Sequence, residues 1–442
     1  MSFIGKAFNS YLSIPLPARI AAGIVIGALC GLVSRNVGNL LEPGDAALLI
    51  RILDPLGLLG DSFISALKAV APLLVLLLVM DAVLYSGRKF DPRLGRIVLL
   101  YLLSTVLAAL AAVTVSFLMP VDLILPETVD APASGPGEQL TLGGILSSLI
   151  VGLFMNPLDA LLQGKFLSIL MWAGMAGMAL KICARDTTRE MIHDLSLGAT
   201  KCVGWIISLA PLGIMGLVYS AAAANGPGIF QTYGMLILSL LLAMALTGLV
   251  INPLLVFLTA RINPYPLVFR ALRESGVTAF FTRSSAANIP VNMRLCRKMG
   301  FEESVFSVSI PLGATVNMCG AAVTITVMTL ATVHTLGMEV TFLQAAALCC
   351  ISALGACGTS GVAGGSLLLI PLACSVFGIP YDVAMATVGV GFVIGVIQDS
   401  METALNSSSD VVFTGAAEYA HWKKHGKGAA GEADAGIPEE AD

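Results

Sequence analysis

Long apolar runs with few charges recur along the chain, and they restrict its fold more than any other feature. Of its 442 residues, 57% are hydrophobic and only 12% are charged, whereas a soluble protein carries about 25% charged residues. Each run is close to the roughly 20 residues that a helix needs to cross the hydrocarbon core of a bilayer. We therefore predict an all-α polytopic membrane protein. The runs lie near 15–36, 60–86, 95–119, 141–161, 197–223 and 232–258, with a further, broken apolar piece at 160–183.

The charges and the cysteines argue against other classes of protein. The formal net charge is −4 and no basic run is interleaved with aromatic residues, so we expect no nucleic-acid partner. The nine cysteines include no CxxC pair, which favours buried free thiols over disulfides or a zinc site.

The apolar run 16–33 follows Lys6 and is long enough to span the membrane. We interpret it as a retained first span, with a cleaved signal peptide as the alternative.

Basic residues gather in alternate connections and predict the orientation. Lys and Arg follow the second and sixth runs and precede the fifth, whereas 120–140 contains four acidic residues and no Lys or Arg. Because basic residues concentrate on the cytoplasmic side, we expect both termini in the cytoplasm and the protein in the cytoplasmic (inner) membrane.

The Gly/Ala-rich tail 416–442 is expected to be disordered. A metal-binding pair formed by His421 and His425 is the alternative for that tail.

The segment 391–410 begins as an ordinary apolar span and then carries three carboxylates. At about 100° per residue, five of its polar side chains fall within roughly a third of the helix circumference. An acidic side chain at the centre of a bilayer costs on the order of 2.5–3.5 kcal/mol, so three on one stripe need a compensating function. We predict a polar site inside the protein that binds a cation, an ammonium group, or both. The stripe consists of Asp399, Glu402, Thr403, Asn406 and Asp410.

Two later apolar segments, 272–292 and 341–372, are interrupted at their centres by small and polar residues. Interrupted segments at corresponding positions of two half-repeats are typical of a transporter's binding site. Non-helical backbone is tolerated at membrane depth only where it lines a cavity, so we predict two hairpins that enter the membrane and return. Their helix N-termini and free amides would suit a carboxylate. In the second segment four glycines favour a hinged loop over close helix packing; they are Gly358, Gly361, Gly364 and Gly365.

A run of small residues with a polar centre, ATVNMCGAA at 314–322, follows the first broken segment. An unwound turn there would offer hard oxygen ligands to an alkali cation, with a carboxylate of the stripe supplying the charge. The alternative is that Asn317 only forms a hydrogen bond between packed helices. The ligands of the ion site would be the carbonyls of Gly313, Thr315 and Asn317 and the side chains of Asn317, Asn406 and Asp410.

Arg283 lies in the first broken segment, and a guanidinium at membrane depth must be paired. Asp399 and Glu402 are the natural partners, which leaves Ser284 and Ser285 to meet the substrate. Direct binding of a substrate anion by Arg283 is the alternative. We expect no enzyme, because the chain has no GxSxG motif and its histidines lie away from the broken segments.

These motifs resemble those of the dicarboxylate/amino acid:cation symporter family. RSSAANIPVN resembles the tip of that family's first re-entrant hairpin, NMCGA the NMDGT motif of its seventh span, and GTSGVAGGS the tip of its second hairpin. The spacing D-x-x-E-T-x-x-N-x-x-x-D resembles the substrate motif of its eighth span. The resemblance covers about 15–415 and is strongest to the bacterial branch that couples sodium to serine and threonine.

The resemblance implies eight transmembrane helices, two re-entrant helical hairpins, inverted repeats, a homotrimer and an elevator-like movement of a transport core against a scaffold. The cytoplasmic N-terminus would occupy 1–14. Residues 15–262 would form mainly the scaffold, with the third and sixth spans joining the core. The transport core would occupy 263–415.

The resemblance also implies roles for individual residues. Asp399 and Thr403 would hold the ammonium group of the substrate. One sodium ion would be held by the carbonyls of Gly313 and Asn317 together with Asn406 and Asp410. The substrate carboxylate would be held by Ser285, Asn406 and the hairpin backbone around Val362 and Ala363. A second sodium ion would be held by Thr315, Met318, Ala356, Cys357 and Thr359.

Two departures from the family pattern bear on the substrate and on the coupling ions. Members that take acidic substrates carry an arginine at the position of Glu402. In this chain the Glu402 carboxylate would repel a second carboxylate on the substrate, whereas a substrate hydroxyl would donate a hydrogen bond to it. Cys319 replaces the aspartate of NMDGT, so we expect fewer coupled sodium ions. We predict import of serine and threonine with sodium as the coupling ion and with no cofactor. The alternatives are an acidic amino acid or dicarboxylate carrier, a proton-coupled neutral amino acid symporter, and an ion channel.

Overall fold

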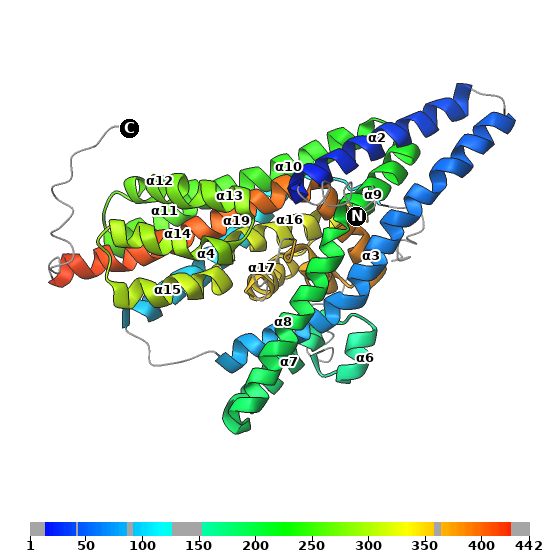
Figure 1. The fold of residues 1–442 in the computed structure, drawn as a ribbon. Helices are drawn as coiled ribbons and strands as arrows, with labels where there is room; N and C mark the ends of the chain where they lie inside the picture. The colour runs from blue at the N-terminus through cyan, green and yellow to red at the C-terminus, as the bar shows by residue number, and fades with distance from the viewer. Residues whose placement is uncertain (1–13, 41–42, 86–91, 126–152, 358–363, 426–442) are drawn as a thin grey trace, which may run out of the picture.

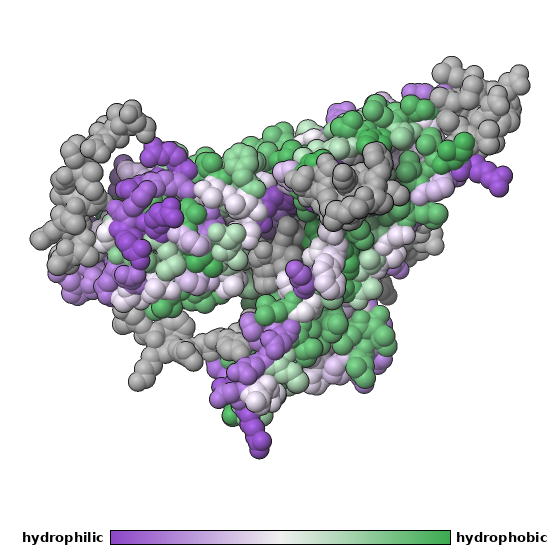
Figure 2. All heavy atoms as spheres, in the orientation of Figure 1, coloured by the Kyte–Doolittle hydropathy of each residue, from purple (hydrophilic) through white to green (hydrophobic). Residues whose placement is uncertain are grey.

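The computed structural model describes residues 14–40, 43–85, 92–125, 153–357 and 364–425. Every regular element within these ranges is helical (Figure 1). Six of the described helices are long and apolar enough to cross a membrane, or seven if one bent pair counts as a single span. Apolar side chains cover much of the surface between two hydrophilic ends, one over α12 and α14 and one at the tip of α7 and α8 (Figure 2). The predicted all-α, polytopic membrane class is therefore confirmed.

The N-terminal helices pack into one group, in which α2 runs along α9 and α3 contacts α7, α8 and α9. Gly23, Gly27 and Gly31 of α2 face the backbone of α9, where a Cβ would overlap carbonyl groups. Glycines at steps of four allow this close approach. The helices are α2 (Leu16–Leu40), α3 (Pro43–Tyr85), α6 (Pro157–Leu162), α7 (Phe166–Cys183), α8 (Asp186–Ser208) and α9 (Ala210–Asn225).

The span predicted near 197–223 is formed by two helices at an angle rather than by one straight helix. The chain forms α8 and α9, which meet at Leu209 with a bend of 53°. Pro211 is the second residue of α9. Proline lacks a backbone N–H and its ring clashes with the preceding turn, so the helix is interrupted at this position.

A second group of helices surrounds two long helices, α16 and α19, whose residues are almost all buried. The third predicted span, α4, packs against α15, α16, α17 and α19, and the sixth, α10 with α11, packs against α19. A π-helical turn, Thr247–Ile251, joins α10 to α11. The helices are α4 (Pro92–Leu118), α10 (Gly228–Leu246), α11 (Asn252–Ala260), α15 (Glu303–Val316), α16 (Cys319–Thr335) and α19 (Tyr381–His425).

The two broken segments form helix–turn–helix units, both in contact with α19. The first turns at Arg283 and Ser284, where Arg283 adopts a left-handed conformation with φ of 52°. The second turns between Ala356 and Leu367, and its residues 358–363 lie outside the described residues. The arms of the first unit are α12 (Tyr265–Ala271), a π-turn (Leu272–Gly276), α13 (Val277–Thr282) and α14 (Ser285–Lys298). Those of the second are α17 (Phe342–Ala356), a 3-10 turn (Leu367–Leu369), α18 (Ile370–Cys374) and a 3-10 turn (Ser375–Phe377).

The predicted start of the disordered tail, at residue 416, is wrong. Helix α19 continues to His425, so 416–425 are helical, and 426–442 lie outside the described residues. Glu418 in this stretch is fully buried and lies 3.3 Å from a guanidinium nitrogen of Arg93. Tyr419 and Trp422 pack against Phe301. These tertiary contacts hold a segment whose composition alone predicts disorder.

Candidate functional site

The acidic stripe lies on α19, deep in the second group of helices, and all five of its members are buried. Residues at helical steps of three and four share one face. Helices α15 and α16, the tip of the first helix–turn–helix unit and the second unit all bring polar atoms to this face. The stripe is therefore the point where the chain's separated polar motifs meet.

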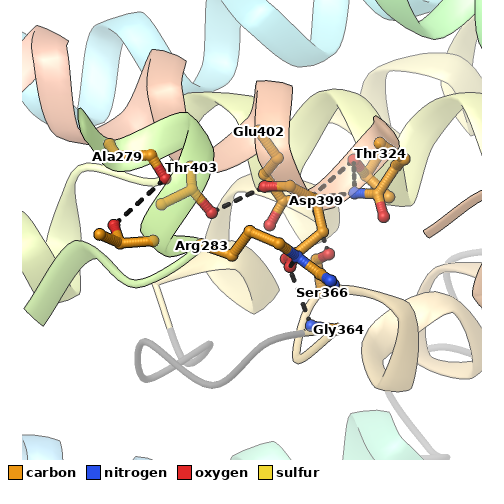
Figure 3. A network of polar contacts seen from close by, with 10 residues as sticks. Ala279, Arg283, Thr324, Gly364, Ser366, Asp399, Glu402 and Thr403 are labelled. Carbon is orange, nitrogen blue, oxygen red and sulfur yellow. Dashed lines mark hydrogen bonds and ion pairs between the residues drawn. The ribbon is translucent and has the colours of Figure 1, made fainter. Parts of the chain in front are cut away.

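Asp399 is held by both helix–turn–helix units. One carboxylate oxygen, Oδ2, lies 2.7 Å from Nε of Arg283, and the other, Oδ1, accepts a hydrogen bond of 3.2 Å from the backbone N–H of Gly364 (Figure 3). The side chain of Arg283 is 11% exposed and that of Asp399 is 5% exposed. A buried charge requires such a partner, and the predicted pairing of Arg283 with Asp399 is observed.

Glu402 does not share this arginine; among the described residues Arg283 forms an ion pair with Asp399 alone. Three neutral groups instead donate hydrogen bonds to Oε2 of Glu402 (Figure 3). They are the hydroxyl of Thr324 at 2.8 Å, the hydroxyl of Ser366 at 2.8 Å and the side-chain amide of Gln398 at 2.5 Å. The expectation that Arg283 neutralises both carboxylates is therefore wrong for Glu402, because neutral donors satisfy its buried oxygen.

The two serines at the tip of the first unit differ. Ser284 is the N-cap of α14, and its hydroxyl oxygen accepts a hydrogen bond from the N–H of Ala287 at 3.2 Å. N-caps of this kind satisfy one of the free donors of a helix N-terminus. Ser285 is the first residue of α14 and is 5% exposed. Of the two, Ser285 has the hydroxyl that the cap does not occupy.

Thr403 and Asn406 continue the stripe away from Asp399. The Thr403 hydroxyl donates to the backbone carbonyl of Asp399 at 2.7 Å. The Asn406 side-chain oxygen accepts a hydrogen bond of 2.7 Å from the N–H of Gly320, and its amide lies 3.4 Å from the sulfur of Met318. Asn406 thus joins α19 to the first turn of α16.

The polar turn predicted near Asn317 is present, because α15 ends at Val316 and α16 begins at Cys319. The Asn317 amide donates to Oδ1 of Asp410 at 2.8 Å and to the backbone carbonyl of Asn406 at 3.2 Å. Two acceptors at this place, Oδ1 of Asn317 and Oδ2 of Asp410, are buried and have no hydrogen-bond partner among the described residues. Leaving a buried acceptor unsatisfied is costly, and a bound cation would satisfy both.

Gly313 lets the Asp410 carboxylate approach this turn. A Cβ on Gly313 would overlap the carboxylate of Asp410 and crowd the hydroxyl of Tyr101. Of the residues predicted for the first ion site, Gly313, Asn317, Asn406 and Asp410 are therefore close together in space, and their role in binding an ion stays a prediction.

The residues implied for a second sodium ion are brought together only in part. Cys357, just after α17, lies with its sulfur 3.3 Å from the carbonyl of Val316 at the end of α15. Met318 and Ala356 are buried, whereas Thr315 is exposed and its hydroxyl bonds to Leu312. Thr359, Val362 and Ala363 lie outside the described residues.

A small cavity adjoins the Arg283–Asp399 pair. Its polar wall is formed by Arg283, Gly364 and Asp399, and its apolar wall includes Ile20 of α2 and Ile214 of α9. The pair therefore lies where the second group of helices faces the N-terminal group.

Gln398, Thr324 and Ser366 were not singled out from the sequence. Gln398 precedes Glu402 by four residues and lies on its helix face, so its position on the stripe was detectable. Thr324 and Ser366 reach Glu402 only through tertiary packing, from 78 and 36 residues away.

Comparison with known proteins identifies the family of this chain. A serine/threonine transporter SstT of Bifidobacterium adolescentis is 46% identical over 427 residues, which cover 97% of this chain and 96% of that protein. A serine/threonine transporter SstT of Streptococcus thermophilus is 48% identical over 406 residues, which cover 92% of this chain and 96% of that protein. The family model described as the sodium:dicarboxylate symporter family matches residues 16–419. The chain therefore belongs to the sodium:dicarboxylate symporter family of membrane transporters.

Proposed function

We propose that this protein imports serine and threonine together with sodium across the cytoplasmic membrane. The observation that carries the proposal is the buried Glu402 carboxylate, which neutral donors hold one helical turn from Asp399. Asp399 has the charge to hold a substrate ammonium group, as the family resemblance implies. The names of two relatives that the chain matches over more than nine-tenths of its length support the same substrates.

Glu402 selects against acidic substrates. A second carboxylate on the substrate would meet this buried carboxylate and be repelled, whereas a side-chain hydroxyl has a proton to donate to it. A bidentate arginine would be needed to hold a second carboxylate. Among the described residues, the one cation that forms an ion pair with the stripe is Arg283, which is paired with Asp399.

The coupling ion is proposed to bind between the Asn317 turn and Asp410. Both unpartnered acceptors there are oxygens, which alkali cations prefer, and the carboxylate supplies a negative charge. Because the site joins α15 and α16 to α19, an ion bound there would order the helix that carries the substrate residues.

One sodium ion provides enough driving force for nutrient uptake. Moving one charge is worth about 2.3 kcal/mol per 100 mV, and a tenfold sodium gradient adds about 1.4 kcal/mol. Together these support accumulation on the order of several-hundred-fold. A second coupled ion is not required for this function.

The finer architecture is part of the proposal. We place both termini in the cytoplasm, count eight spans, and assign the two helix–turn–helix units as re-entrant hairpins. The packing of α4, α10 and α11 onto α16 and α19 supports their inclusion in a transport core with residues 263–415, which would move against a trimeric scaffold of the N-terminal helices. In this arrangement the Arg283–Asp399 cavity lies between core and scaffold.

The test is uptake of labelled serine into proteoliposomes with an imposed sodium gradient and with unlabelled competitors. We expect saturable, stereoselective uptake that requires sodium, competition by threonine and none by aspartate. Equal uptake in choline and sodium buffers would overturn sodium coupling, and a current independent of amino acid would favour a channel. Uptake driven by a proton gradient without sodium would favour the proton-coupled alternative.

The dicarboxylate alternative follows from the description of the family. It is tested by Glu402→Arg, which places a guanidinium where members with acidic substrates carry one. We expect the variant to lose serine uptake and to gain binding of aspartate. Competition by aspartate in the unaltered protein would favour the alternative instead.

A further inference from the structure

The protons available around Glu402 determine which group donates and which accepts in each hydrogen bond. The amide nitrogen of Gln398 has two protons, and it donates to Oε2 of Glu402 at 2.5 Å and to the hydroxyl oxygen of Thr324 at 2.8 Å. Since the Thr324 hydroxyl accepts from Gln398, its own single proton goes to Oε2 of Glu402 at 2.8 Å. The hydroxyl of Ser366 is the third donor to Oε2, and Figure 3 shows Glu402 with Thr324 and Ser366.

This arrangement treats the two oxygens of the Glu402 carboxylate differently: Oε2 receives three hydrogen bonds, and Oε1 receives none from the described residues. Three donors from α16, the second helix–turn–helix unit and α19 itself hold Oε2 in place and so fix the plane of the carboxylate. No described residue donates a hydrogen bond to Oε1. The Oε1 atom of Gln398 is also a buried acceptor that has no partner in the described part of the chain, on a residue that is 1% exposed.

Glu402 lies next to the residue that is proposed to hold the substrate ammonium group. Glu402 follows Asp399 by three residues on the same face of α19, and Asp399 lines the cavity beside Arg283 and Gly364. The side-chain hydroxyl of serine or threonine carries one proton that it can donate to Oε1 of Glu402. Alanine has no hydroxyl and would leave Oε1 of Glu402 without a donor. Sites that bind a hydroxyl in this way strongly reject analogues that lack it.

We propose that Gln398 and Thr324 are positioning residues that orient the Glu402 carboxylate toward the side-chain hydroxyl of the substrate. This inference rests on the proposed import of serine and threonine and names the residues that set its specificity. Gln398 and Thr324 act through Glu402 and need not touch the substrate. Their effect is therefore confined to substrates that carry a hydroxyl.

The test compares serine, threonine and alanine as competitors of labelled serine uptake by the full-length protein in proteoliposomes. Thr324→Val keeps the shape of the side chain and removes its hydroxyl, and Gln398→Met removes the amide. In each variant we expect the inhibition constants of serine and threonine to rise at least tenfold and that of alanine to change less than twofold. Thr324→Ser restores the hydroxyl and is expected to restore the serine preference.

Thr332→Val is the matched control, because Thr332 is buried on the same helix and bonds to Thr387, away from Glu402. It is expected to keep the serine:alanine ratio of the unaltered protein. An equal rise for serine and alanine in Thr324→Val, or an unchanged ratio, would overturn the inference while leaving serine import intact. If the unaltered protein fails to prefer serine to alanine, this inference is overturned while serine import stands, whereas absence of sodium-driven serine uptake by the unaltered protein would overturn the proposed function.

Discussion

Nε of Arg283 lies 2.7 Å from Oδ2 of Asp399, although the two residues are 116 positions apart in the chain. Arg283 reaches the carboxylate from the tip of a helix–turn–helix unit, in a left-handed backbone conformation that is uncommon for a residue with a side chain. The carboxylate assigned to the substrate ammonium is therefore already paired with an internal cation. This pair leads to the first prediction.

Arg283→Met is expected to destabilise the protein when no substrate is present. Removing one partner of a buried ion pair costs about 3–5 kcal/mol, because the remaining charge has no partner. Serine should restore part of this loss, since its ammonium group can take the vacant place beside Asp399. Thermal unfolding of the purified protein, with and without serine, measures both effects.

The control for Arg283→Met is Arg297→Met, which breaks an exposed pair with Glu303. Exposed pairs contribute about 0–1 kcal/mol, so its melting temperature should scarcely change. A serine-induced rise in melting temperature that is no larger in Arg283→Met than in the unaltered protein would contradict the prediction.

Asp410→Asn is expected to weaken sodium binding. The substitution removes the carboxylate charge from a site in which Oδ1 of Asn317 is a second acceptor without a partner among the described residues. We expect the sodium concentration for half-maximal serine uptake to rise at least tenfold, which corresponds to about 1.4 kcal/mol. Asp382→Asn, at the exposed start of the same helix, is the control and should leave this concentration unchanged. Unaltered sodium affinity in Asp410→Asn would remove the basis for the ion site.

Gly313→Ala is expected to damage the same ion site from the opposite side. The added methyl group would overlap the Asp410 carboxylate and crowd Tyr101, and overpacking of this kind typically costs about 1–3 kcal/mol. We expect a lower melting temperature and a higher sodium requirement for uptake. Gly234→Ala on α10 is the control, because a Cβ there meets no atom within 4 Å. If both alanine variants bind sodium as the unaltered protein does, Gly313 has no part in the site.

Cys319→Asp is expected to increase the dependence of the protein on sodium. Cys319 is fully buried at the start of α16, with its sulfur 3.7 Å from the Ser409 hydroxyl. A carboxylate placed there without a cation would be a buried, unpaired charge. Sodium should therefore raise the melting temperature of this variant more steeply, and the sodium dependence of uptake should become steeper. Cys319→Asn, which adds no charge, should show neither change.

Some features of the fold and of the site followed from local sequence alone. The apolar runs indicated membrane helices because hydrocarbon leaves the backbone no partner except itself. The spacing of Asp399, Glu402 and Asp410 indicated one polar face because the period of a helix is fixed. The polar turn at Asn317 was also visible, since small and polar residues interrupt an otherwise apolar run. The assigned roles of these residues remain predictions.

Other features depended on contacts between distant segments. Composition predicted disorder from residue 416, but α19 is helical to His425, and Glu418 and Trp422 contact Arg93 of α4 and Phe301 of the connection between α14 and α15. Likewise, nothing near Glu402 in the sequence showed that Thr324 and Ser366 would satisfy its carboxylate in place of Arg283.

The sequence by itself determined that the chain is helical, that it spans a membrane and that one helix carries a buried acidic face, because hydropathy and helical period are local properties. Only the tertiary structure decided which donor meets which carboxylate: Arg283 meets Asp399, Asn317 meets Asp410, and Thr324 meets Glu402. The physical reason is that a hydrogen bond needs two atoms within about 3 Å, and packing alone brings residues so far apart in the chain to that distance.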